Sequence, residues 1–208
     1  MRGLLLKDFY MVWKYCKIYL IVVLVFIAVF IVGDNSLYFV FYPCLLAGMI
    51  PITLIAYDER SGWESYCKGL PYTGVQIVSA KYIVGLCCQA LTLLLTGIAF
   101  AARMIYAEKF DIGEFLYFLI LVQVISCAAS ASVLPFLYRF GVEKGRIAYY
   151  VMVGLIVAGA FICMNLNQKD VSGGAALTWI PWAVCATGIA VYALSWRLSV
   201  VFYRKREG

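Results

Sequence analysis

The chain alternates long apolar runs with short polar segments. Six apolar runs approach or exceed the roughly 17 to 25 residues that cross a bilayer as a helix. They lie at about 18–33, 37–57, 82–102, 113–136, 147–166 and 176–200. The pattern predicts an all-α polytopic membrane protein with six transmembrane helices. Its transmembrane domain is expected at 18–203, between an N-terminal segment at 1–17 and a basic tail at 204–208.

Composition supports a membrane protein. Of 208 residues, 65% are apolar and 13% are charged, and the mean hydropathy is +0.92. Soluble domains are only about half apolar and about one quarter charged. The composition therefore excludes an ordinary soluble domain.

Basic residues predict the orientation of the chain. Six spans place both termini on one side, and that side receives 14 of the 17 lysines and arginines. The other three are Arg103, Lys109 and Lys169. Cytoplasmic loops carry such an excess, so both termini and the loop at 57–81 are expected in the cytoplasm. The net charge of +6 then reflects this topology and anionic membrane lipid as a partner, and no nucleic acid is expected.

The N-terminal segment at 1–17 has the pattern of an amphipathic helix lying at the membrane interface. One side of that helix is polar and carries Lys7, Tyr10, Lys14 and Lys17. The other side is apolar and carries Leu5, Phe9, Val12, Trp13 and Cys16. The segment leads directly into the first span and is expected to anchor it.

The second span contains two prolines, Pro43 and Pro51. Proline kinks a membrane helix and frees carbonyl groups that neighbouring helices must satisfy. Such a kink serves equally well as a hinge, as a cavity wall or as simple packing.

Elsewhere the spans carry uncharged polar residues, among them Gln89, Gln123 and Ser130. Cross-linking of helices explains these better than a substrate pathway.

The loop "YDERSGWESYCKGLPYTG", which opens the segment at 57–81, is the most polar stretch. Trp63, Tyr66, Cys67 and Leu70 recur at helical spacing, while Glu59, Arg60, Glu64 and Lys68 fall on other faces. The pattern predicts a short cytoplasmic helix whose aromatic centre and charged rim dock a soluble partner. A helix lying on lipid is the alternative. The candidate partner-binding residues are Glu59, Arg60, Trp63, Glu64, Tyr66 and Leu70.

Two further signals end this loop. Pro71 stops the short helix, and Thr73 with Gln76 forms the pattern of a capping box. The third transmembrane helix is therefore expected to begin near Thr73, well before its apolar run.

The sequence argues against an enzyme. It contains no histidine, no G-x-S-x-G motif and no Walker A loop, and its eight cysteines are scattered. Catalytic, cofactor-binding and metal-binding residues are not expected in this chain. Three functions remain: the membrane half of an ATP-driven transporter, the substrate-capture subunit of a vitamin uptake complex, and a non-transporting membrane anchor.

The longer run "YDERSGWESYCKGLPYTGVQIVSAKYIVG" resembles the first cytoplasmic loop of ABC-2 type permeases. The shared features are an acidic residue, a tryptophan, Leu-Pro, and a helix of the form I-V-x-A-K-Y. With the N-terminal helix and the six-span layout, the similarity covers the whole chain. It is similar in particular to the short permeases of phenol-soluble modulin exporters.

The resemblance implies that Leu4–Lys17 is a connecting helix and Glu59–Gly69 a coupling helix between spans two and three. It also implies a bacterial cell membrane, a homodimer of permeases, and two separate ABC ATPase subunits that bind ATP and Mg. The expected function is export of an amphipathic peptide or a lipid-like or drug-like substrate, because an apolar cavity cannot easily desolvate a strongly charged solute.

Overall fold

The computed structural model describes all residues except 1, 33–37, 68, 107–110, 167–179 and 208. Its described part consists of helices and turns, with no strand, which confirms the prediction of an all-α protein. The helices are α1 (Arg2–Tyr15), α2 (Lys17–Val32), α3 (Tyr38–Ala47), α4 (Ile50–Arg60), α5 (Trp63–Cys67), α6 (Gly74–Tyr106), α7 (Ile112–Phe140), α8 (Val142–Leu166) and α9 (Ile180–Glu207).

Three segments of the described chain are long and apolar enough to cross a membrane: Gly74–Tyr106, Phe115–Phe140 and Ala186–Lys205. A fourth results if α1 and α2, which are bent by 61°, are counted as one broken span. The predicted second span is divided into α3 and α4, of 10 and 11 residues, and each is too short to cross a bilayer alone. The described residues thus support three to four of the six predicted spans.

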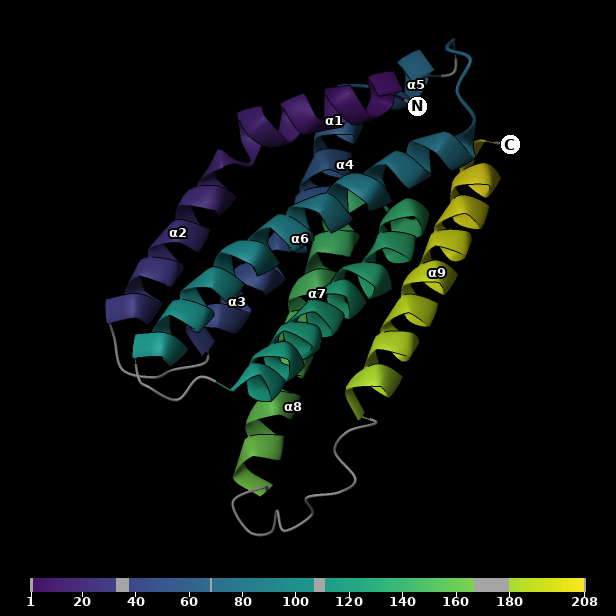
Figure 1. Cartoon of the computed structure of the whole chain (residues 1–208). Helices are drawn as coiled ribbons and strands as arrows, with labels where there is room; N and C mark the ends of the chain where they lie inside the picture. The colour runs from purple at the N-terminus through teal and green to yellow at the C-terminus, as the bar shows by residue number, and fades with distance from the viewer. Residues whose placement is uncertain (1, 33–37, 68, 107–110, 167–179, 208) are drawn as a thin grey trace.

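The helices form an elongated bundle with both chain termini at one end (Figure 1). We call this the terminal end; it also carries α5, the start of α6 and the last turn of α9. Within the bundle, α9 and α8 both pack along α7, and α6 contacts α3, α7 and α9. The helix α1 runs across the terminal end and packs against α6 and α4.

The helix α1 lies within the predicted segment at 1–17 and ends at Tyr15, but its faces differ from the prediction. Leu4 and Asp8 are buried against the bundle, whereas Tyr10 and Trp13 are exposed. The prediction that Lys7 belongs to an outward polar stripe is wrong, because its ammonium group turns inward to two aspartates. A bilayer interface accommodates exposed aromatic side chains on such a helix.

The break between α3 and α4 confirms the prediction from the prolines. The turn is tightened by a hydrogen bond from Gly48 N to Leu45 O, which leaves Cys44 O without its helical donor. The hydroxyl of Ser126 on α7 donates to Cys44 O at 2.7 Å, and the hydroxyl of Tyr149 on α8 donates to Leu45 O. Gly48 allows this approach, since a Cβ there would lie 2.8 Å from the Tyr149 hydroxyl oxygen.

We expect Ser126→Ala to lower the free energy of unfolding by about 1–3 kcal/mol, because it leaves a buried carbonyl without a donor. Ser132→Ala is the matched control on the same helix, since the Ser132 hydroxyl donates only to Ala128 O within α7. Thermal unfolding of the purified chain in detergent measures both. Equal shifts for the two variants would contradict the role assigned to Ser126.

Polar side chains inside the bundle mostly link helices. Gln89 Nε2 on α6 donates to Ser130 Oγ on α7 at 2.7 Å. The hydroxyl of Tyr82 on α6 lies 2.7 Å from the hydroxyls of both Ser195 and Ser199 on α9. These buried bonds support the packing interpretation of the uncharged polar residues.

Candidate functional site

The loop between α4 and α6 contains the predicted docking helix, in a shorter form. The helix α4 continues to Arg60, and Gly62 then adopts a φ of 68°, a left-handed conformation that glycine tolerates best. The following helix α5 covers only Trp63–Cys67. The single helix expected over Glu59–Gly69 is therefore divided, because Gly62 turns the chain.

The candidate docking residues do not share one face. Trp63 and Leu70 are partly buried and pack against the hydrophobic core. Tyr66 is 65% exposed, and Glu59 and Arg60, the last residues of α4, are also exposed. The side chain of Glu64 lies outside the described part of the structure. Tyr66, rather than Trp63, is thus the outward-facing aromatic residue of this segment.

Trp63 instead contacts α1. The Lys7 ammonium nitrogen on α1 lies 4.0 Å from the centroid of the Trp63 ring. The rings of Trp63 and Tyr66, one helical turn apart, are neighbours, with their centroids separated by 5.5 Å. A cation over an indole ring contributes roughly 0.5–2 kcal/mol, depending on its desolvation. The contact fastens α5 to α1.

Below this contact lies a cluster of four charged residues, which we call the charge cluster: Lys7, Asp8, Asp58 and Lys81. Lys81 Nζ lies 2.7 Å from Asp8 Oδ1 and 2.5 Å from Asp58 Oδ2. Lys7 Nζ lies 2.8 Å from Asp58 Oδ1 and 3.4 Å from Asp8 Oδ1. Each lysine therefore contacts both aspartates, and the formal charges sum to zero.

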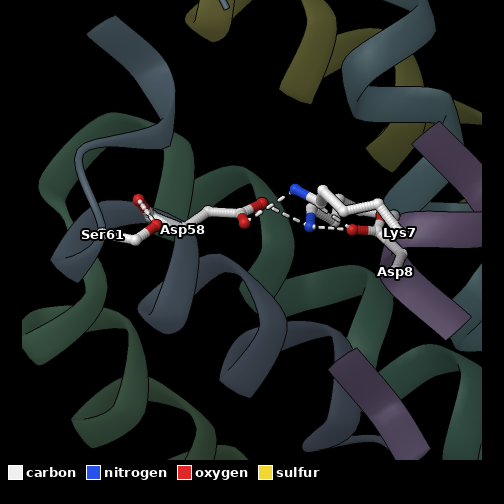
Figure 2. Close-up of polar contacts among 5 residues, drawn as sticks. Lys7, Asp8, Asp58 and Ser61 are labelled. Atoms are coloured by element: carbon white, nitrogen blue, oxygen red, sulfur yellow. Dashed lines mark hydrogen bonds and ion pairs between the residues drawn. The ribbon is translucent and has the colours of Figure 1, made fainter. Parts of the chain in front are cut away.

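Three of the four residues of the charge cluster are buried, and Lys7 is partly exposed. Asp8, Lys81 and Asp58 are 1%, 3% and 7% exposed. Figure 2 shows the Asp58 carboxylate directed at Lys7, with Asp8 beyond that lysine, while the Asp58 backbone carbonyl accepts a hydrogen bond from Ser61 on the opposite side. Buried charges persist in a protein only when they are paired and hydrogen-bonded, and this arrangement pairs all four.

The charge cluster joins three helices that are distant in sequence. Lys7 and Asp8 belong to α1, Asp58 lies near the end of α4, and Lys81 lies near the start of α6. Through the contact between Lys7 and Trp63, it also holds α5. The charge cluster thus gives α6, the longest of the described helices, direct contacts with both α1 and α4.

The start of α6 agrees with the prediction. Gln76 N donates to Thr73 Oγ1 at 3.4 Å, and Thr73 N donates to Gln76 Oε1 at 3.3 Å. These reciprocal bonds are the predicted capping box. The helix accordingly begins at Gly74, two turns before Lys81.

The charge cluster was not predicted from the sequence. The sequence pattern placed Asp58 and Lys81 within the loop at 57–81 but assigned a partner to neither of them. A usable signal was Lys81 itself, a lysine two turns into a largely apolar helix, since such a residue requires a partner. The pattern alone does not say which of the 11 acidic residues pairs with Lys81.

Comparison with curated proteins and with solved structures found no match. Comparison with protein families found one whose description is "ABC-2 family transporter protein", and it matches residues 3–204. The matched segment includes the charge cluster, α5 and all the apolar spans. Since the match extends over nearly the whole chain, the protein belongs to the ABC-2 family of transporter proteins.

Proposed function

We propose that this ABC transporter permease is an exporter subunit that moves an amphipathic peptide, or a lipid-like or drug-like substrate, out of a bacterial cell. A separate ABC ATPase subunit would bind ATP and Mg and supply the energy. The apolar composition of the spans supports an amphipathic cargo, because such walls cannot easily desolvate a strongly charged solute.

Six spans, counted as α2, the broken pair α3 and α4, then α6, α7, α8 and α9, belong to this proposal. The common position of the two termini in Figure 1 supports an even number of crossings. The excess of basic residues on that side supports a cytoplasmic terminal end. Two copies of the permease, pairing as a homodimer, would then face two ATPase subunits.

The observation that carries the proposal is the charge cluster. It ties α1, α4 and α6 together directly beneath the exposed side of α5. An ATPase that contacts Tyr66, Glu59 and Arg60 would then act on four helices that are held together (α1, α4, α5 and α6). It would not act on an isolated loop. Rigid-body movement of these four helices would change the access of a central cavity from one side of the membrane to the other.

Assembly with an ATPase tests the proposal. We expect the purified chain alone to hydrolyse no ATP, because it has no Walker A loop. Co-expression with its cognate ABC ATPase should yield a stable complex, and native mass measurement should give two copies of each subunit. Recovery of the permease without any ATPase would contradict the proposal, and tight retention of a vitamin would favour the uptake subunit.

A further inference from the structure

A groove of about 390 Å³ runs between α7 and α9, on the side of α9 away from Gln123 and Tyr192. It extends from Ala131 to Arg139 along α7, which is about 12 Å at the rise of an α-helix, and from Val191 to Phe202 along α9, about 16 Å. Half of a bilayer's hydrocarbon core is roughly 15 Å thick. The groove therefore has the length of one leaflet and opens toward the terminal end.

The walls of this groove are apolar. They are formed mainly by Pro135, Phe136, Leu194, Leu198 and Phe202. Two hydroxyl groups also border it, but Ser132 donates to Ala128 O and Ser195 donates to Ala131 O. The hydroxyls are thus engaged within the protein, and the groove offers a long apolar surface to its occupant.

One charge stands at the end of the groove. The Arg139 guanidinium lies 5.1 Å from the centroid of the Phe140 ring and 5.4 Å from that of Phe202. It makes no ion pair within the described residues, and none of the residues lining the groove is acidic. Arg204 and Lys205, which are exposed on the last turns of α9, do not line the groove.

We propose that this groove binds an anionic phospholipid of the leaflet at the terminal end, with an acyl chain along α7 and α9 and the phosphate at Arg139. Two properties of the groove support this occupant over a second copy of the chain: its length matches one leaflet, and its single cation stands where the headgroup layer begins. Arginine presents a planar set of donors that suits a phosphate, and two aromatic rings hold it in place. The proposal does not depend on the exporter function, because it concerns only lipid binding by the permease.

The test is native mass spectrometry of the full chain after removal of bulk lipid, with phosphatidylglycerol and phosphatidylcholine added separately. We expect the natural chain to retain one phosphatidylglycerol more tightly than phosphatidylcholine. Arg139→Gln should weaken phosphatidylglycerol retention about tenfold, the size of one charge-assisted hydrogen bond, and leave phosphatidylcholine unchanged. Arg139→Lys should restore part of the difference, and Arg204→Gln, the matched control outside the groove, should change it little.

Two further arms separate the parts of the site. Val191→Trp, which fills the deep end of the groove, should weaken both lipids, and free glycerol phosphate should not displace phosphatidylglycerol. Equal phosphatidylglycerol retention by Arg139→Gln and the natural chain would overturn the proposal, as would an equal loss in Arg204→Gln. Disulfide-linked dimers through a cysteine at Leu194, in a cysteine-free background, would show a second copy over the groove and overturn it as well.

Discussion

Replacing Lys81 by methionine is expected to lower the free energy of unfolding by about 3–5 kcal/mol. Lys81 contacts Asp8 at 2.7 Å and Asp58 at 2.5 Å, and both carboxylates are buried. Methionine preserves the apolar stem but removes the charge, so two aspartates must then share Lys7. Denaturant-induced unfolding of the purified chain in detergent micelles, followed by tryptophan fluorescence, measures the loss.

Lys7→Met is the control for this prediction. The Lys7 side chain is 23% exposed, against 4% for Lys81, and Lys81 can still bridge both aspartates after Lys7 is removed. We therefore expect Lys7→Met to lower the free energy of unfolding less than Lys81→Met does, even though it also removes the contact of Lys7 with Trp63. Equal effects of the two substitutions, both below about 1 kcal/mol, would show that the charge cluster contributes little to folding.

A second variant separates the charge from the packing. The double substitution of Asp8 by Asn and Lys81 by Met leaves the pair of Lys7 with Asp58 at 2.8 Å, which is neutral overall. We expect it to recover about 1–3 kcal/mol relative to the sum of the two single changes. Strict additivity would mean that Asp8 and Lys81 act independently, although Lys81 Nζ lies 2.7 Å from Asp8 Oδ1.

Local signals in the sequence predicted the local structure well. Apolar runs predicted the helices, the pair of Thr73 and Gln76 predicted the start of α6, and the prolines predicted the broken second span. Each signal acts between residues a few positions apart, so the sequence displays it directly. The boundaries of the docking helix were missed because helical periodicity continues through Gly62, whereas the backbone turns there.

The charge cluster could not be predicted in the same way. Lys7 and Asp58 are 51 positions apart, and Asp8 and Lys81 are 73 positions apart. Their pairing depends on how α1 crosses the terminal end of the bundle. The amphipathic pattern of α1 assigned Lys7 to the outward polar side of the helix, but the tertiary pairing of a lysine with two buried aspartates outweighs that preference. The direction in which Trp63 points follows from the same pairing.

The two aromatic residues of α5 should therefore behave differently when truncated. Tyr66 is largely exposed, so Tyr66→Ala should leave the thermal midpoint of the permease unchanged. If Tyr66 fills a pocket on the ATPase, its loss should weaken ATPase capture by about 2 kcal/mol, roughly 30-fold. Trp63→Ala removes a partly buried ring and its contact with Lys7, so it should lower the thermal midpoint as well.

The measurement is the amount of ATPase that co-purifies with each permease, alongside ATP hydrolysis in lipid nanodiscs. Tyr106→Ala is the matched control, because Tyr106 is 91% exposed at the end of α6 far from the terminal end. We expect Tyr66→Ala to lose capture at unchanged stability, and Trp63→Ala to lose coupled hydrolysis even at ATPase concentrations that restore capture. The physical reason is that Trp63 connects α5 to the charge cluster, whereas Tyr66 faces the partner. If Tyr66→Ala retains as much ATPase as the natural chain and supports the same rate of ATP hydrolysis, the ATPase does not bind α5 through Tyr66. The coupling role proposed for this loop would then be wrong.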